Sequence, residues 1–322
     1  MTSSEMPDFT AEYATPLYAT QQQTQAHTQT QTQGLWYPTE MWRLMIVHRT
    51  ELTYPDTVTT SYNEVRMQPL EEPGQSVLSS RMEIDPFEGV TAYADYYGTR
   101  VAAFDLHRPH RHLTITSTST VETFTPPEDP ARQPLSWEEL SASDANDRFE
   151  EFLTPTALTE LSDELAGRAE KIREEAATPA DAARAACDLV RRVVRYEQGA
   201  TGVHTSAVEA WEEKRGVCQD FSHLVCALIR ATGIPARYVS GYLHPAPESE
   251  IGRAVVGQSH AWVEWWDGAW NAFDPTNGAP PGLAHVVVGR GRDYTDVPPV
   301  KGVYAGPDAT GNTVTVRVTR LR

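Results

Sequence analysis

Three residues whose side chains could together perform thiol chemistry follow one another along the chain: Cys218, His260 and Asp274. A thiol can attack a carbonyl carbon, an imidazole can carry the proton, and a carboxylate can orient the imidazole. These are the parts of thiol-based acyl transfer. We therefore predict that the three are catalytic, provided that the fold brings them together.

Cys218 begins a segment with helical periodicity, in which apolar residues recur at i, i+3, i+4 and i+7. These residues are Phe221, Leu224, Val225 and Leu228. The N–H groups and partial positive charge of a helix N-terminus favour a thiolate and can hold an oxyanion. Gly216 is expected to let the backbone turn into this helix. The alternative for Cys218 is a small buried residue at a helix start, and Cys187 and Cys226 are expected in the core.

His260 and Asp274 lie in two strand-like segments on either side of Asp267-Gly268. A two-residue turn there would place Ala261 opposite Asp274 and send His260 to the other face of the sheet. A three-residue loop of residues 266–268 would instead place His260 directly opposite Asp274, with Gly268 in a left-handed conformation. Cross-strand partners have Cβ atoms about 5 Å apart, within hydrogen-bonding reach for these side chains. We predict the three-residue loop.

Several neighbouring residues could shape the cleft. Gln219 follows Cys218 directly, and Tyr196 and Trp211 precede it as candidate donors to an oxyanion. His223 lies five residues into the same helix, so it would point away from the thiol and make a poor base. Four tryptophans near His260 are expected to pack in the core rather than to bind substrate. They are Trp262, Trp265, Trp266 and Trp270.

Composition restricts the class of protein. The 322 residues are 40% hydrophobic and 22% charged, with a net charge of −17, so nucleic acid and anionic membranes are unfavourable partners. No apolar stretch approaches the ~20 residues of a membrane span, and no secretory signal precedes Arg43. The three cysteines form no disulfide framework or metal-ligand spacing. We expect a cytoplasmic protein.

No cofactor or metal is expected. The acidic residues show no regular spacing of the kind found in calcium loops. His107, His110 and His112 cluster with Arg108 and Arg111, which could indicate a metal or phosphate site. The fixed positive charges of the two arginines oppose metal binding there.

The chain divides by composition into four parts. Residues 1–40 contain a Gln/Thr-rich run and are predicted to be disordered. Residues 41–125 form a β-rich domain, whose expected strands are rich in Val, Ile, Thr and Tyr. Residues 126–135 form a Pro-rich linker, and residues 136–322 form the catalytic domain. The expected strands of the β-rich domain are 43–48, 57–67, 76–84, 93–106 and 113–124.

Within the catalytic domain helical patterns come first. Thr178 is a candidate N-cap followed by a proline, and Ser206 with Glu209 forms a capping box for a short helix through Trp211. Strands follow the Cys218 helix at 237–243, 260–266 and 269–273. This order predicts an α+β fold of the papain-like type.

Four motifs of this chain resemble the bacterial transglutaminase-like family. They are Gly216-Val-Cys218-Gln-Asp-Phe-Ser-His-Leu, Ile229-Arg-Ala-Thr-Gly-Ile-Pro-Ala-Arg237-Tyr-Val-Ser-Gly-Tyr242, His260-Ala-Trp-Val-Glu264 and Asp274-Pro-Thr-Asn-Gly278. The resemblance extends to Ser61–Pro69, Tyr93–Gly98 and Leu113–Thr118 upstream and to Gly291–Pro299 downstream. It implies a Cys-His-Asp triad at Cys218, His260 and Asp274 on a papain-like core, preceded by the family's β domain.

The resemblance leaves the reaction open, because the superfamily includes proteases, amidases, deglycosylating enzymes, cross-linkers and inactive scaffolds. We expect hydrolysis of a peptide or protein amide or isopeptide bond, since water is always present and the sequence marks no amine-binding pocket. Transamidation or amide-bond formation with an amine acceptor is the first alternative. A non-catalytic module whose β domain binds a protein partner is the second.

Overall fold

The computed structural model describes residues 40–127 and 132–322. Apart from Glu40, the predicted disordered tail lies outside the described residues, and so do residues 128–131 of the predicted linker. All described residues belong to one compact unit. Its elements are α+β, as the sequence predicts, with a β-rich region followed by a papain-like core.

Six strands make up the first region. They are β1 (Met41–Val58), β2 (Thr60–Val65), β3 (Gln75–Asp85), β4 (Thr91–Ala94), β5 (Arg100–Leu106) and β6 (His110–Phe124). Three predicted strands differ from these. β1 continues to Val58, well beyond the predicted strand 43–48, the predicted strand 57–67 breaks after Val58, and the predicted strand 93–106 is divided by a turn at Gly98. In β6 buried and partly exposed residues alternate, which is the pattern of a strand with one face in the core.

The helices are α1 (Trp137–Ala142), α2 (Ala145–Arg148), α3 (Asp163–Glu175), α4 (Pro179–Val193), α5 (Ala207–Glu213) and α6 (Cys218–Ala231), with short 3₁₀ turns η1 (Glu150–Phe152) and η2 (Tyr294–Asp296). The predicted start signals are confirmed. The hydroxyl of Thr178 accepts a hydrogen bond from the backbone N–H of Asp181 at the start of α4. Ser206 and Glu209 form both bonds of the capping box at the start of α5.

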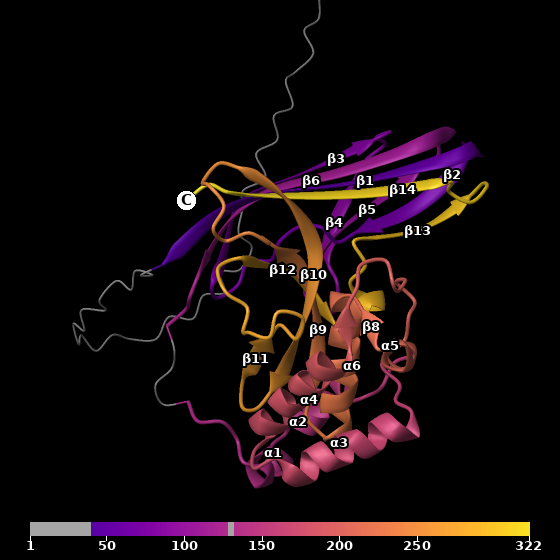
Figure 1. Ribbon diagram of the computed structural model, residues 1–322. Coiled ribbons are helices and arrows are strands. Elements are labelled where there is room, and N and C mark those ends of the chain that lie inside the picture. Colours follow the sequence, from indigo (N-terminus) through magenta and orange to yellow (C-terminus); the bar gives the residue numbers. More distant parts are fainter. Residues whose placement is uncertain (1–39, 128–131) are drawn as a thin grey trace, which may run out of the picture. The chain divides into compact units, whose positions relative to one another are not determined.

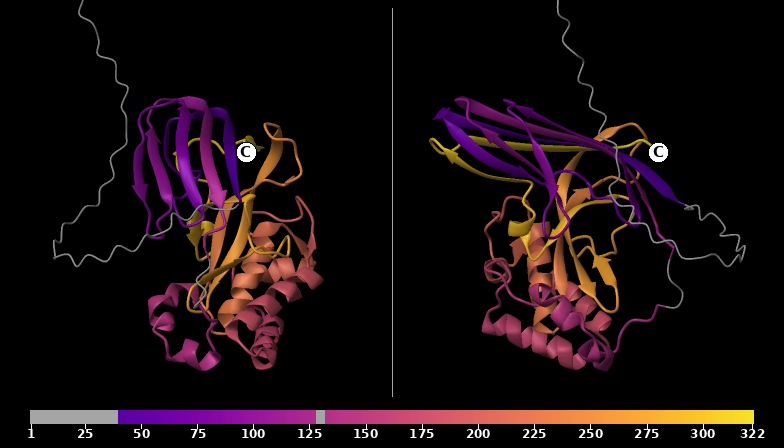
Figure 2. Two further views of the ribbon diagram at one scale, coloured as in Figure 1. Left: turned by 90° about the vertical axis from the view of Figure 1, so that its left-hand side faces the viewer. Right: turned by 180° about the vertical axis from the view of Figure 1, so that it is seen from behind.

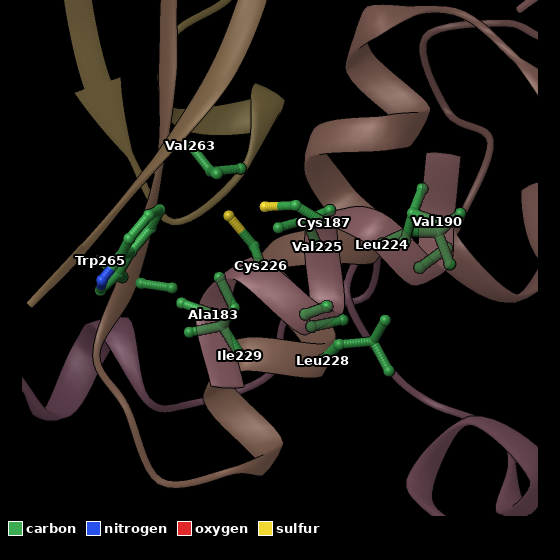
Figure 3. Packing of buried hydrophobic residues seen from close by; sticks show 14 of the residues in the cluster. Ala183, Cys187, Val190, Leu224, Val225, Cys226, Leu228, Ile229, Val263 and Trp265 are labelled. Carbon is green, nitrogen blue, oxygen red and sulfur yellow. The ribbon is translucent and has the colours of Figure 1, made fainter. Parts of the chain in front are cut away.

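Helix α6 lies at the centre of the core, and every residue from Gln219 to Arg230 is buried. Helices α3, α4 and α5 pack on it from one side, and β9 (Ala236–Leu243) and β10 (Ala254–Trp266) from the other. Figure 3 shows side chains of α4, α6 and β10 packed together there. A helix held on all sides gives its first residue, Cys218, a fixed position.

The remaining strands follow the helices. They are the short parallel pair β7 (Arg195–Tyr196) and β8 (Arg215–Gly216), then β11 (Trp270–Phe273), β12 (His285–Gly291), β13 (Val300–Ala305) and β14 (Gly311–Arg320). The large sheet has the order β12-β9-β10-β14-β1-β6-β3, with β11 also paired to β10. A second sheet has the order β13-β2-β5-β4. The views of Figure 2 show the helices grouped around the orange strands and away from the indigo ones.

Strand β10 changes partners along its length (Figure 1). Residues 254–257 pair with β14, residues 258–265 pair with β9, and residues 263–266 also pair with β11. Within the described chain, residues 258–262 therefore have β9 on one edge and neither β14 nor β11 on the other. His260 lies in the middle of this interruption, where a strand edge is left open to the cleft.

The two C-terminal strands depart from the predicted division, which placed residues 136–322 together in the catalytic domain. β14 pairs with β1 and β13 pairs with β2, so both extend the sheets of the N-terminal region. Alternation of apolar and polar residues in a segment indicates that the segment is a strand. It does not indicate which distant strand that segment pairs with. The pairing of the chain's last strands with its first could therefore not be predicted locally.

Candidate active site

His260 and Asp274 are in direct contact. His260 Nε2 lies 2.6 Å from Asp274 Oδ2, and the two side chains are 7% and 0% exposed. The prediction that they share a face of the hairpin is thus confirmed. The predicted register is wrong by one loop position, because Trp266 pairs with Trp270 and the three loop residues are 267–269. Asp274 lies beyond the end of β11 and forms a bridge with Ala279.

The aromatic rings at the hairpin end account for this register. The Trp266 and Trp270 rings are cross-strand partners with centroids 5.6 Å apart, and both pack against Phe149, at 4.8 and 5.0 Å. Such aromatic pairs stabilise one register over its neighbours. Gly268 adopts a φ of 92° in the loop, a conformation that favours glycine.

The Asp274 carboxylate accepts hydrogen bonds at both oxygens. The backbone N–H groups of Thr276 and Asn277 donate to Oδ1 at 2.9 and 3.1 Å. The Asn277 side-chain amide donates to Oδ2 at 2.6 Å, and His285 Nε2 lies 3.2 Å from the same oxygen. Against burial, these donors and His260 hold the pKa of Asp274 far below its usual range. Asp274 is therefore an anion with a fixed orientation.

The surroundings of His260 favour its charged form. Burial lowers its pKa, but hydrogen bonding to Asp274 and then to Cys218, together with the charges of both, outweighs burial and raises the pKa to about 9. Because Nε2 is occupied by Asp274, the ring nitrogen left for Cys218 is Nδ1. The imidazole thus lies between a carboxylate and a thiol, the arrangement that the sequence predicts.

Cys218 is the first residue of α6 and is partly exposed. Its helix start is held by Asp220, whose Oδ2 accepts hydrogen bonds from the Val217 backbone N–H at 2.7 Å and the Thr201 hydroxyl at 2.6 Å. Gly216 has a different role from the predicted one. Its φ is not in the left-handed region, but a Cβ there would lie 2.7 Å from Asp220 Cβ, so glycine makes room for this capping carboxylate.

The other two cysteines are in the core, as predicted. Cys187 and Cys226 are fully buried, and Figure 3 shows both sulfurs among the side chains of α4 and α6. Burial raises the pKa of Cys226 to about 11 and that of Cys187 further. Neither thiol reaches the cleft.

Two hollows meet at His260. One, of about 360 Å³, is lined by Cys218, Tyr238 and Val314 among others, and the second, of about 430 Å³, by Val256 and Asn277. Tyr196, Gln198, Gln258 and His260 line both hollows. The Tyr196 hydroxyl donates to Gln258 Oε1 at 3.4 Å, so this pair lies on the boundary between them. Among the described residues that line either hollow, none is acidic, and none is basic except His260.

The three candidate oxyanion donors have different positions. Tyr196 lines the cleft, and burial together with the Cys218 charge raises its pKa, so the phenol keeps its proton. Gln219 lines the cleft but donates its amide to the Val203 carbonyl at 3.1 Å. The prediction that Trp211 is an oxyanion donor is wrong. Its side chain is 2% exposed and packs in the core with residues of α5 and α6, and the Lys214 ammonium lies over its ring. Its position on the buried stripe of α5 excludes it from the cleft.

His223 is buried in α6 and lines neither hollow at His260, in keeping with the prediction that it points away from the thiol. Its Nε2 accepts a hydrogen bond from the Tyr294 backbone N–H at 3.2 Å, and burial lowers its pKa to about 4. This bond anchors η2 against α6 and brings Tyr294 to the cleft. Tyr294 and Tyr238 were not predicted as cleft residues, although both lie in segments that resemble the family.

His285 was also not identified. With His260 and Asp274 it forms the group of potential metal ligands found among the described residues, with the three ligand atoms within 4.8 Å of one another. The backbone N–H of Gly282 donates to His285 Nδ1 at 3.1 Å. A metal on Nε2 would require a proton on Nδ1, which would then face that N–H group. The hydrogen bonds therefore oppose a metal here.

The side chains of the His107–His112 segment are not arranged as the ligands of a metal site. Glu88 accepts hydrogen bonds from the backbone N–H groups of His107 and Arg108 at 2.6 and 3.0 Å. His110 is buried, with its Nδ1 2.9 Å from the Arg108 carbonyl oxygen. These contacts fix a turn between β5 and β6.

Two family models match the chain. The Transglutaminase-like superfamily matches residues 166–275, which contain Cys218, His260 and Asp274. The Bacterial transglutaminase-like N-terminal region matches residues 44–122, which lie across strands β1 to β6.

Individual relatives agree with these matches. Protein ML0607 of Mycobacterium leprae is 44% identical over 281 residues, which cover 87% of this chain and 100% of the relative. A crystal structure of a candidate cysteine protease from Cytophaga hutchinsonii has the same fold, with a TM-score of 0.71 and 24% identity over 89% of this chain and 93% of that one. A protein-glutamine gamma-glutamyltransferase of Pseudomonas aeruginosa is 31% identical over 99 residues, which cover 27% of this chain and 14% of that protein.

Proposed function

Because the chain belongs to the transglutaminase-like superfamily, we propose that it is a thiol enzyme that transfers acyl groups from amide or isopeptide bonds through Cys218, His260 and Asp274. One observation carries the proposal. His260 is held at 2.6 Å by a buried carboxylate while its other side meets Cys218, and its pKa is raised to about 9. An imidazolium beside the sulfur is the partner that a nucleophilic thiolate requires.

The reaction follows from this arrangement. Cys218 Sγ attacks the amide carbonyl carbon, and the carbonyl electrons move to oxygen. The C–N bond then breaks as His260 gives its proton to the departing amine, which leaves an acyl thioester on Cys218. Water attacks the thioester while His260 takes one of its protons, and the C–S bond breaks. The products are a carboxylic acid and the starting enzyme.

Two kinds of donor are available for the oxyanion. The backbone N–H groups of Cys218 and Gln219 precede the first hydrogen bonds of α6, in which Asp220 and Phe221 donate to the Val217 carbonyl, and they are the backbone donors nearest the sulfur in sequence. We propose Tyr196 as the side-chain donor, because its phenol is protonated, lines both hollows and donates only a long bond to Gln258 at rest. Its rotation from Gln258 Oε1 to the oxyanion would strengthen binding in the transition state alone.

The lining of the cleft supports a neutral substrate. The two hollows combine amide and hydroxyl groups with apolar side chains and hold no acidic residue among those described. A charged side chain would lose hydration there without gaining a partner. The proposed substrate is therefore a peptide or protein amide that is uncharged around the bond.

Hydrolysis is our first proposal for the second step, and transamidation is the second candidate. The hollow lined by Val256, Leu243 and Asn277 supports the second candidate, because His260 lines it and Cys218 does not. The amine that leaves, and any amine that replaces water, must both exchange a proton with His260. This hollow is thus where a leaving group or an acceptor amine would lie.

The test measures how the acyl-enzyme partitions between attack by water and attack by an added amine. With a neutral peptide amide as donor, the ratio of transfer product to acid is measured against the concentration of an alkyl amine. Hydrolysis predicts acid at all concentrations, and transamidation predicts a transfer product that rises to saturation. Val256→Glu should change this ratio, whereas Val314→Glu in the other hollow should change kcat/KM for the donor. Cys218→Ser must abolish both products, and any turnover left in it would contradict the proposal.

A cytoplasmic location belongs to the same proposal. In the described chain no helix is long and apolar enough to cross a membrane. The three thiols are free, and Cys218 must remain reduced to act. Fractionation of cells that express the full chain, with a cytoplasmic and an exported marker, tests the location.

A further inference from the structure

A second imidazole contacts the carboxylate of the proposed triad. His285 begins β12, its side chain is 12% exposed, and its Nε2 lies 3.2 Å from Asp274 Oδ2. It lines neither hollow that contains His260 and instead lines a separate one together with Trp262. His285 therefore approaches Asp274 without touching the cleft.

The hydrogen bonds of His285 fix which nitrogen carries its proton. The Gly282 backbone N–H donates to Nδ1 at 3.1 Å, so Nδ1 must present a lone pair. A neutral imidazole then carries its hydrogen on Nε2, which faces Asp274. An imidazolium would place a second N–H against that of Gly282. The contacts thus select a neutral His285 that donates to Asp274.

The backbone around His285 is built to hold this ring. β12 pairs with β9, and Gly241 on β9 has no room for a side chain, because a Cβ would lie 2.1 Å from the Val286 carbonyl oxygen and 2.5 Å from the Trp262 ring. The Trp262 ring packs edge-on against His285, with centroids 5.4 Å apart. Close approach of these three groups sets the position of His285 independently of its bond to Asp274.

We propose that His285 is a positioning residue for the reaction, an inference that rests on the proposed function. Backbone N–H groups fix Oδ1 of Asp274, and Asn277 and His285 occupy two directions at Oδ2. His260 is the third group on Oδ2, so the bonds from Asn277 and His285 limit the directions from which its ring can approach. His285 also stabilises the anion, so Asp274 holds the proton of His260 less tightly and His260 can release it to the leaving amine.

Two variants separate this role from packing. His285→Phe keeps an aromatic ring against Trp262 but removes the donor, and His285→Gln keeps an N–H group close to the position of Nε2. His285→Phe should lower kcat roughly tenfold, the size expected for one hydrogen bond to a charged group, with little change in KM. Its alkaline limb in the pH–rate profile should move to higher pH, because Asp274 then holds the proton more tightly. His285→Gln should keep most of the wild-type kcat and leave the alkaline limb close to its wild-type pH.

A spectroscopic measurement needs no turnover. In ¹⁵N-histidine-labelled protein, His285 should show a protonated Nε2 and an unprotonated Nδ1, in the wild type and in Cys218→Ser alike. A protonated Nδ1 would overturn the proposal. So would a folded His285→Phe with unchanged kcat and pH profile, or stoichiometric Zn²⁺ binding that His285→Phe abolishes. If Cys218→Ser remains active, the proposed function fails instead, and the spectrum still tests His285.

Discussion

His260 Nε2 lies 2.6 Å from Asp274 Oδ2, although the two residues are not cross-strand partners. Asp274 follows the end of β11, where backbone N–H groups of the next two residues turn its carboxylate back toward β10. The contact therefore depends on the turn after the hairpin as well as on the hairpin itself. Substitutions of Asp274 should therefore affect His260 by disturbing the hydrogen bonds of this turn.

Asp274→Asn should lower kcat by about 10³–10⁴ with little change in substrate binding. Each hydrogen-bonding partner of this carboxylate described above is a donor, so an asparagine NH₂ would face N–H groups in either orientation. The imidazole would lose its fixed tautomer. Steady-state kinetics of the purified variant measure the effect.

The control combines Asp274→Asn with Cys218→Ser. Members of a triad act as a unit, so the double variant should be as inactive as Cys218→Ser alone and should keep the same fold. Near-normal turnover in Asp274→Asn would leave Asp274 as a turn residue before Pro275.

The pH dependence of kcat/KM should have an alkaline limb near pH 9. The active form holds a protonated His260, and its pKa is about 9 in the folded protein against an ordinary value of 6.5.

The same pKa shift of His260 makes the stability of the folded protein depend on pH. Because the folded pKa is raised, this contribution is fully present below pH 6.5 and is lost as the pH rises through 9, by up to about 3 kcal/mol.

Chemical unfolding at several pH values tests the stability half of this prediction. Asp274→Asn should flatten the loss of stability between pH 6.5 and 9, because it removes the carboxylate that raises the His260 pKa. An acid limb near pH 6.5 in the wild type, with no alkaline limb near pH 9, would show that His260 reacts as an ordinary neutral base.

Cys218 should react with iodoacetamide far faster than Cys187 or Cys226 in the native protein. It is partly exposed beside His260, whereas the other two thiols are buried. Peptide mass spectrometry after short exposures gives the three rates. In urea the rates should converge, and equal rates in the native protein would remove the physical basis for a nucleophilic Cys218.

Gly216→Ala should destabilise the protein by roughly 1–3 kcal/mol and lower kcat, since its Cβ would overlap Asp220 and disturb the start of α6. Gly202→Ala is the matched control, because a Cβ there meets nothing within 4 Å and its φ is not left-handed. Urea denaturation and kinetics compare the pair. Equal stability of the two variants would show that the α6 start tolerates displacement of Asp220.

Local patterns were sufficient to predict helices α4, α5 and α6 and the face shared by His260 and Asp274, whereas α1, α2 and α3 were not predicted. The capping residues of α4 and α5 are correct because caps depend on neighbours three residues away. The hairpin register was wrong because it depends on Phe149, a residue between α2 and η1 that packs on Trp266 and Trp270. The predicted register was based on the loop residues around Gly268 alone, which carry no information about the contact with Phe149.

Three features needed contacts between distant segments. His285 reaches Asp274 only because β12 pairs with β9, and nothing in its own segment marks it as part of the site. β14 joins β1 at the other end of the chain. Trp211 was misplaced because an indole in a helix pattern can face a cleft or a core, and the packing of α5 on α6 decides between them.

The most direct test of a nucleophilic Cys218 is the mass of the protein after mixing with an activated neutral acyl ester. His260→Ala should slow deacylation, so a covalent adduct should accumulate in this variant. We predict a mass increase equal to one acyl group, located on Cys218 by peptide mapping and absent when Cys218→Ser is added. An adduct on another residue, or one that persists without Cys218, would contradict the account.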